Sequence, residues 1–166
     1  GYFMAVLKVI EYPNPILNKK AERVGKLGKE DFRLIQGMVE TMYEEDGVGI
    51  AAPQVGAARR IIIVSPQAKR GEEQVYVNPE ITEASQEGEI GLEGCLSLPG
   101  ISCEIRRSKR IKLEALDLKG QKVVYEFQDF PARVVQHEVD HLNGVLIIDR
   151  VDFNQRQTLL SGYQRL

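Results

Sequence analysis

The sequence has few cysteines and histidines, no long apolar run and little net charge, and each of these features argues against a class of protein. It holds only two cysteines and two histidines in 166 residues. Two cysteines without a signal peptide argue against a disulfide scaffold and indicate a reducing compartment, either the cytoplasm or an organelle reached by a lost transit peptide. No apolar run approaches the roughly 20 residues of a membrane span, which argues against a membrane protein. The net charge of −2 argues against direct nucleic-acid binding.

Length and composition favour one globular domain. A chain of 166 residues can bury a core, and 43% hydrophobic with 28% charged residues is typical of a folded protein. We therefore expect a single domain over residues 1–166. Gly1, Tyr2 and Phe3 precede Met4, and we expect them to be a cloning remnant.

The periodicity of apolar residues predicts an α+β fold. Neighbouring strands without helices between them favour mainly antiparallel sheets, which we expect to pack around a central helix, with a further helix near the N-terminus. The predicted helices cover 29–45, the segment around 136–144, and 154–160. The predicted strands cover 61–64, 74–84 (broken at Asn78 and Pro79), and a hairpin of 111–116 and 123–127. Glycine-rich segments at 47–56 and 88–100 are predicted to be a turn and a loop.

Both histidines lie in the motif QHEVDHLNG at 136–144. Four residues of helix turn by about 400°, so His137 and His141 share one face and are spaced to hold one tetrahedral metal ion. Glu138 is turned by about 100° from His137, which places it beside the open metal position rather than at it. The alternative is a surface helix on which acidic and imidazole groups merely alternate.

Two histidines need a third protein ligand to make a catalytic metal site. After His141 the chain has no histidine and no glutamate, and its only acids there are Asp149 and Asp152. Cys95, in a glycine-flanked segment upstream, offers a thiolate, although a small buried apolar residue is the alternative. Cys103 lacks such a neighbourhood, and we predict that it is structural and not disulfide-bonded to Cys95.

The segment GVGIAAPQ at 47–54 is a third candidate. It lacks the last glycine of a nucleotide-binding loop and follows a predicted helix, where that loop follows a strand. A tight glycine turn that lets a substrate backbone approach is the better interpretation. Gln54 then offers an amide donor for a developing oxyanion, with a buried structural glutamine as the alternative.

Together these three segments resemble the motifs of the peptide deformylases, in that family's order. The matching segments are GVGIAAPQ at 47–54, EGCLS at 93–97 and QHEVDH at 136–141. The resemblance implies one catalytic domain that removes the formyl group from N-formylmethionyl nascent peptides and releases formate. It implies one divalent metal ion, Fe(II) in the native state, with Zn, Ni or Co in purified protein. The implied ligands are Cys95, His137 and His141.

The resemblance also implies roles around the metal. Glu138 becomes the proton shuttle, while Gln54 and the backbone N–H of Leu96 hold the oxyanion. The residues implied to bind the substrate main chain are Val48, Gly49 and Gly94. Those implied to border the methionine pocket are Phe130, Val134 and His137.

The chain departs from the family pattern at two positions. Ser102 stands where many members carry an arginine, which bears on recognition of the peptide beyond methionine. Arg133 occupies a helix position that is apolar in some members, although its stem can still line a pocket. Partners implied by the resemblance are formylated peptides and the ribosome exit region, and we expect a monomer. The tail after Arg150 is short and not notably basic, which weakens the ribosome expectation.

Two rival functions remain open from the residues. A zinc endopeptidase uses the same metal helix, but it takes a downstream histidine or glutamate that this chain lacks. A non-catalytic binding module stabilised by metal needs a fourth protein ligand, which only Cys103 or an acid can supply.

Overall fold

The computed structural model describes residues 5–163, so the expected cloning remnant and Met4 lie outside the described residues. Three α-helices lie in this range: α1 (Lys29–Glu44), α2 (Asp129–Leu142) and α3 (Phe153–Ser161). Short 3-10 turns cover Pro15–Asn18, Ala52–Val55 and Ile147–Asp149. The predicted helices are thereby confirmed, with ends shifted by a few residues.

Seven strands form two antiparallel sheets in the described range. The larger sheet has the order β1-β2-β3-β6-β7, and β4 pairs with β5 in the smaller one. The bounds are Gly49–Ala51 for β1, Ile61–Val64 for β2, Gln74–Ala84 for β3, Gly88–Gly94 for β4, Ser102–Ser108 for β5, Arg110–Leu116 for β6 and Lys122–Gln128 for β7. The α+β class with mainly antiparallel pairing is confirmed.

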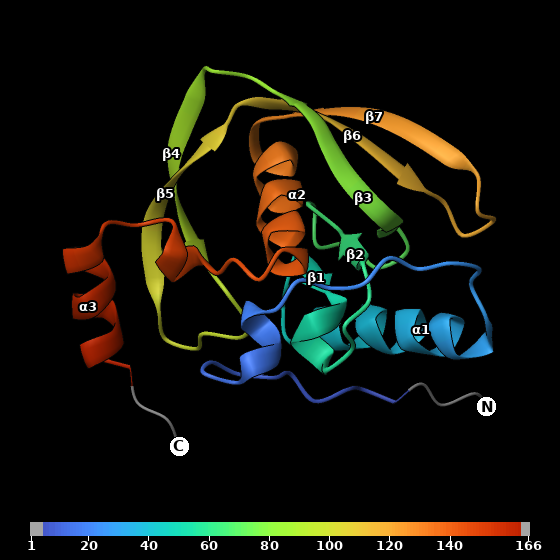
Figure 1. The fold of residues 1–166 in the computed structure, drawn as a ribbon, viewed down its shortest axis with the longest axis horizontal. Coiled ribbons are helices and arrows are strands. Elements are labelled where there is room, and N and C mark those ends of the chain that lie inside the picture. Colours follow the sequence, from blue (N-terminus) through green and yellow to red (C-terminus); the bar gives the residue numbers. More distant parts are fainter. Residues whose placement is uncertain (1–4, 164–166) are drawn as a thin grey trace.

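Helix α2 lies at the centre of the molecule, with the larger sheet curving over one side and β4–β5 on the other (Figure 1). Its apolar residues recur at helical spacing and pack into the same buried cluster as residues of β2, β3 and β6. On α2 this cluster includes Ala132, Val135, Val139 and Leu142. The helix ends at Leu142, and the chain then turns at Gly144, whose φ of 73° and close approach to the Asn18 backbone leave no room for a Cβ.

The predicted break in the second strand is a bulge inside a continuous β3. Pairing with β6 shifts register between Val77 and Glu80, and Asn78 has a φ of 49°. The Asn78 side chain accepts from Val24 N and donates to Val24 O, both at 2.8 Å. These bonds compensate for the interrupted ladder, so the strand bends without ending.

The prediction of a loop over 88–100 is wrong for its first half, which is strand β4. Its glycines serve close packing rather than a loop. A Cβ on Gly91 would lie 2.9 Å from the Arg133 guanidinium carbon, and one on Gly88 would lie 2.5 Å from that of Arg106. The turn predicted over 47–56 similarly contains the short, fully buried strand β1.

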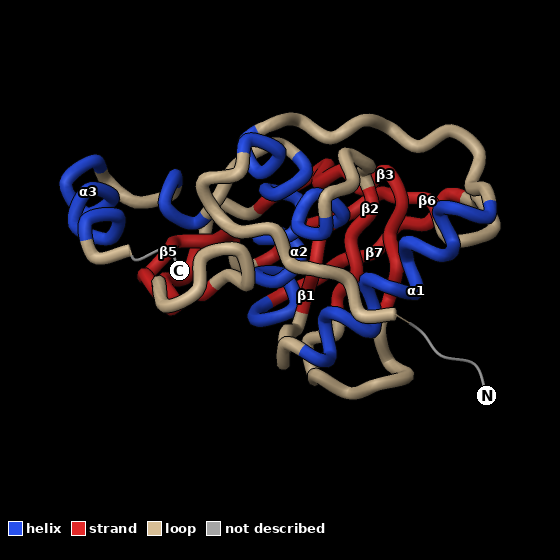
Figure 2. Tube along the Cα trace, turned by 90° about the horizontal axis from the view of Figure 1, so that it is seen from below, coloured by secondary structure: helices blue, strands red, loops and turns tan. Residues whose placement is uncertain are grey.

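Helices α1 and α3 lie at opposite ends of the molecule (Figure 2). Helix α1 packs its apolar face, including Ile35, Met38 and Met42, into a second buried cluster with β1 and β2. Among the described residues, no helix has the length and apolar character needed to cross a membrane.

Candidate active site

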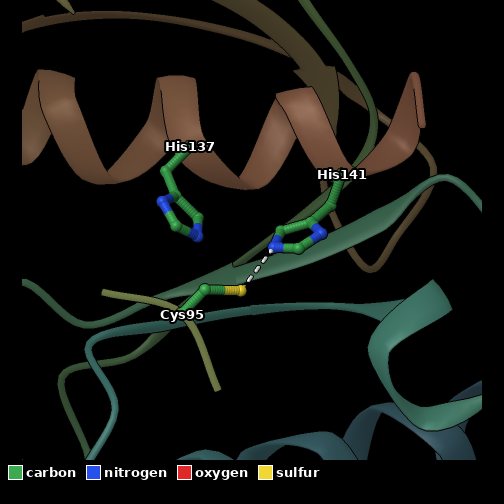
Figure 3. Close-up of side chains that lie close together, drawn as sticks. All are labelled: Cys95, His137 and His141. Atoms are coloured by element: carbon green, nitrogen blue, oxygen red, sulfur yellow. Dashed lines mark hydrogen bonds between the residues drawn. The ribbon is translucent and has the colours of Figure 1, made fainter. Parts of the chain in front are cut away.

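The three predicted ligands converge on one point. His137 and His141 project from one face of α2 toward Cys95, which follows the last residue of β4 (Figure 3). The ligand atoms of all three lie within 4.8 Å of one another. The Cys95 Sγ lies 3.3 Å from His141 Nε2. Both cysteines are free thiols, and Cys103 is buried in an apolar cluster against which Cys95 also packs.

These side chains fit a divalent metal ion. Ligand atoms about 2.0–2.3 Å from a tetrahedral ion lie roughly 3.5 Å apart, close to the separation of Cys95 and His141. One sulfur and two imidazole nitrogens suit a first-row transition metal. Among the described residues, the buried Oε1 of Glu138 has no hydrogen-bond partner. Because buried polar atoms are normally hydrogen-bonded, this indicates that a bound ligand supplies the partner.

Glu138 lies beside this group and against the turn at 47–49. It is 4% exposed, and a Cβ on Gly49 would lie 2.6 Å from its Oε2. Gly49 is therefore required for the carboxylate to occupy its position. Burial raises the pKa of Glu138 to about 7, while the charge of His137 opposes that shift.

The two histidines have different surroundings. His137 donates from Nδ1 to Glu93 Oε1 at 2.8 Å, whereas His141 Nδ1 has no partner among the described residues. Burial lowers the pKa of His137, but the negative groups around it, Glu138 first, raise it overall. Burial, with the charge of His137, lowers the pKa of His141.

Buried charges support His137 from behind, and the sequence reasoning did not identify them. Arg107 binds Glu93 through two nitrogens at 2.8 Å and Asp140 through a third at 2.6 Å. Burial alone would raise the pKa of Glu93, but hydrogen bonds from Arg107 and His137 hold it well below its usual range. The signal was present, because Arg107 follows Cys103 and Ile105 at alternating positions that face the interior.

Gln54 is buried with its amide held in one orientation. Its Oε1 accepts from the backbone N–H of Ala51 at 2.9 Å. Its Nε2 therefore points toward Ser97 Oγ at 3.2 Å and Cys95 Sγ at 3.7 Å. The amide donor thus faces the ligand group, and Leu96 lines the same cavity as Gln54.

A cavity of about 560 Å³ opens onto the ligand group. Apart from His141, which is 1% exposed behind it, every residue predicted for the site lines this cavity. The lining includes Val48, Gly49, Gln54, Gly94, Cys95, Leu96, Phe130, Val134, His137 and Glu138. A second cavity of about 590 Å³ lies over charged residues of β3, β6 and β7. None of the residues predicted for the site lines it.

The two departures from the family pattern also border the cavity. Arg133 donates to Glu93 Oε2, Ile105 O and Glu89 O at 2.7–2.8 Å. Its guanidinium is therefore committed to protein acceptors, and its stem is what remains to line the cavity. Ser102, at the start of β5, is exposed at the rim.

Comparison with known proteins gives a consistent result. A family model described as polypeptide deformylase matches residues 6–157. A peptide deformylase of Thermotoga neapolitana is 50% identical over 144 residues, covering 87% of this chain and 86% of the relative. The crystal structure of peptide deformylase from Thermotoga maritima matches with a TM-score of 0.84 at 44% identity, over 89% of this chain and 99% of that one. The Met-Ala-Ser-bound structure of class I type b peptide deformylase from Acinetobacter baumannii matches with a TM-score of 0.84 at 42% identity, over 90% of this chain and 100% of that one.

Proposed function

Because this chain belongs to the peptide deformylase family, which removes the formyl group from nascent peptides, we propose that Cys95, His137 and His141 hold its catalytic metal. The observation that carries this assignment is the convergence of the three ligand atoms within 4.8 Å. Cys95 supplies the third ligand that the chain lacks after His141. The site therefore needs no downstream ligand, which removes the basis for the zinc-endopeptidase alternative.

Glu138 is the proposed general base and acid. A bound divalent ion acts as a Lewis acid and lowers the pKa of a water molecule. Glu138 would accept a proton from the attacking water and return it to the departing amine. A raised pKa near 7 suits a group that must both accept and release a proton near neutral pH.

Gln54 and Leu96 are the proposed oxyanion donors. The Ala51 N–H fixes the Gln54 amide so that Nε2 is turned toward the ligand group before any substrate arrives. A donor that is oriented in advance stabilises developing negative charge without reorganising during the reaction. The Leu96 N–H supplies a second donor from the backbone next to Cys95.

The cavity is proposed to bind the formylated methionine. Val134 is buried in its wall and Phe130 is half exposed at its rim, so both offer apolar surface to an unbranched side chain. Val48, Gly49 and Gly94 border the same cavity and are proposed to bind the substrate main chain. The Acinetobacter baumannii enzyme, solved with Met-Ala-Ser bound, supports a methionyl peptide as the occupant.

Fe(II) is the proposed native metal. A thiolate ligand gives the ion more negative charge than a third imidazole would, which weakens its Lewis acidity. We infer that iron compensates for this weakened Lewis acidity better than zinc does. We also infer that Zn, Ni or Co replaces the iron during purification. Metal analysis of anaerobically purified protein tests this, and stoichiometric zinc with no iron would contradict it.

The proposed partners follow from the substrate. N-formylmethionyl peptides are made at the ribosome, so the enzyme is proposed to act in the bacterial cytoplasm, as a monomer, near the peptide exit. The bacterial relatives support a bacterial setting. Co-sedimentation with ribosomes and analytical ultracentrifugation measure the two finer points.

The central experiment measures formate release from formyl-Met-Ala-Ser by anaerobically reconstituted protein. Formyl-Asp-Ala-Ser is the matched control, because its carboxylate must lose hydration in an apolar cavity. We expect metal removal to abolish activity and the methionyl peptide to be preferred. The apolar side chain should contribute about 1–3 kcal/mol. Equal turnover of both peptides would contradict the proposed cavity, and activity of metal-free protein would contradict the proposed site.

A further inference from the structure

A short N-terminal segment, residues 10–12, connects the two turns that carry the proposed oxyanion donors. Its first N–H group donates to the backbone oxygen of Gln54 at 2.7 Å, and its last, that of Tyr12, donates to the backbone oxygen of Ser97 at 2.9 Å. Gln54 is one proposed donor, and Ser97 directly follows the other, Leu96. We call residues 10–12 the brace. Two residues of chain span at most about 7 Å, so the brace limits how far apart the two turns can lie.

The bonds of the brace leave the proposed donor atoms available to a substrate. They use the backbone oxygens of Gln54 and Ser97, whereas the proposed donors are Gln54 Nε2 and the Leu96 N–H. The two turns also meet where Gln54 Nε2 donates to Ser97 Oγ at 3.2 Å, but that bond draws on the amide that the oxyanion needs. Oxyanion donors stabilise charge best when they are placed before the reaction begins. We propose that the brace positions Gln54 and Leu96 relative to each other, an inference that rests on their proposed role as oxyanion donors.

Tyr163, just after helix α3, holds the brace from the other side. Its hydroxyl donates to the backbone oxygen of Tyr12 at 3.0 Å. The two rings also meet edge to face, with centroids 6.0 Å apart and planes at 72°. Both backbone polar groups of Tyr12 are therefore bonded, the N–H to Ser97 and the carbonyl to Tyr163. The C-terminal segment is thereby connected to the oxyanion side of the site through a single residue.

The apolar packing around this connection is incomplete, which makes the hydroxyl bond important. Helix α3 has no fully buried residue, and none of residues 153–163 lines the active-site cavity. Tyr163 and Tyr12 are both only partly buried against the apolar cluster that also contacts Cys95. Apolar contact is non-directional, whereas a hydrogen bond to one carbonyl oxygen requires a defined geometry. The Tyr163 hydroxyl therefore supplies the direction that packing alone does not.

The first experiment compares formate release from formyl-Met-Ala-Ser by reconstituted wild-type protein, Tyr163→Phe and Tyr43→Phe. Phenylalanine keeps the ring at position 163 and removes only the hydroxyl, and urea denaturation checks that each variant is folded. Tyr43 is the matched control, because its hydroxyl also donates to a backbone oxygen, that of Lys69 at 2.9 Å. Neither Tyr43 nor Lys69 lines the cavity. Zinc affinity is measured for all three proteins by competition with a chelator.

We expect kcat of Tyr163→Phe to fall about three- to tenfold, the usual worth of one hydrogen bond. Its KM and zinc affinity should stay within about twofold of wild type, because an oxyanion donor acts in the transition state. Tyr43→Phe should match wild type in all three. An unchanged kcat in Tyr163→Phe, an equal fall in Tyr43→Phe, or a fall that follows loss of zinc would overturn the proposal. Wild-type protein that releases no formate would instead overturn the proposed function.

Two further measurements separate positioning from general stability. Tyr163→Phe is combined with Gln54→Ala, which removes one of the positioned donors. The factor lost through Tyr163→Phe should then be smaller than in wild type, because residues that act through each other are not additive. Amide hydrogen exchange of residues 10–12 should be faster in Tyr163→Phe, since local opening follows the loss of a holding contact. Equal factors in the two backgrounds, or unchanged exchange, would overturn the proposal.

Discussion

The two sides of helix α2 contrast in chemistry although both pack against other parts of the protein. One side packs Val135, Val139 and Leu142 against the larger sheet in an apolar cluster. The other side places His137 and Asp140 against buried charges from the smaller sheet. The same 14-residue helix therefore has one side held by apolar contact and one side held by directional bonds.

The contrast separates two physical tasks. Apolar burial contributes about 25 cal/mol per Å² without fixing direction, so it stabilises the helix but does not orient its ligands. Buried ion pairs roughly break even in stability because each charge loses hydration, whereas their hydrogen bonds specify geometry. We infer that the larger sheet supplies the stability of the helix and the smaller sheet supplies the geometry of the site. The following predictions test that division.

The largest expected effect is on catalysis, without loss of the fold or the metal. Glu138→Gln keeps the three ligands and nearly the same shape, but an amide cannot take a proton from water. We expect the rate of formate release to fall about 10²–10⁴-fold, the usual contribution of general acid–base catalysis. Metal content and the urea midpoint should stay close to wild type.

His141→Ala is the matched comparison for Glu138→Gln. It removes a ligand, so metal and activity should disappear together. If Glu138→Gln loses metal in the same way, Glu138 is a ligand or its support, and its role as a base is wrong. If it deformylates at a near-normal rate, the proposed mechanism is wrong.

On the apolar side of α2 we expect the opposite: a substitution should lower stability and leave metal binding nearly unchanged. Leu113 on β6 is fully buried in the cluster that holds α2, so Leu113→Ala leaves a cavity. We expect the free energy of unfolding to fall by about 2–5 kcal/mol, measured by urea denaturation. Zinc affinity of the folded protein should change less than threefold. The control is Val124→Ala, at an exposed position on β7, which should cost under about 0.5 kcal/mol. A large loss of zinc affinity in Leu113→Ala would show that the two sides are not separable.

Alkaline pH offers a smaller test of the apolar side. Tyr76, 4% exposed, has its pKa raised to about 12, first by burial and then by Tyr125. The unfolded chain releases this proton near pH 10, so the folded state binds more protons between pH 10 and 12. The stability contributed by the neutral phenol is therefore present below pH 10 and lost as pH rises.

Between pH 9 and 11 the wild type should lose about 1 kcal/mol more than Tyr76→Phe does, measured by urea denaturation at each pH. Phenylalanine keeps the ring but has no proton to release, so it is the matched control. Parallel stability curves for the two proteins would show that Tyr76 titrates normally in the folded state.

The features that could be predicted from the sequence are those set by a pattern of neighbouring residues. Spacing alone placed His137 and His141 on one helix face with Glu138 beside them, and residue chemistry singled out Cys95, which the structure brings beside the two histidines. Helix α1 was equally clear, because its apolar residues repeat every three or four positions.

The missed features depend on contacts between distant segments. Glycines 88 and 91 suggested a loop, yet both lie in β4, which pairs with β5, and arginine side chains from other elements occupy the space of their missing Cβ atoms. Glu93 is next but one to Cys95 in the sequence, but its four donors come from β5 and α2. The alternation on β5 places Arg107 toward the interior but does not identify Glu93 as its partner, so the support of His137 emerged only from the fold.

The smallest expected effect concerns an ion pair of the same chemistry at the surface. Arg70 donates to Glu40 at 2.7 Å, a distance like those around Glu93, but their side chains are 57% and 30% exposed. Water screens this pair, and holding two long side chains together costs entropy. We expect Glu40→Gln to change the free energy of unfolding by less than about 1 kcal/mol and to leave zinc affinity unchanged. The small stability effect should also shrink further in 1 M salt. A large loss of zinc affinity in Glu40→Gln would mean that charge anywhere on the protein tunes the metal. The orienting role would then belong to the overall field rather than to the buried bonds behind His137.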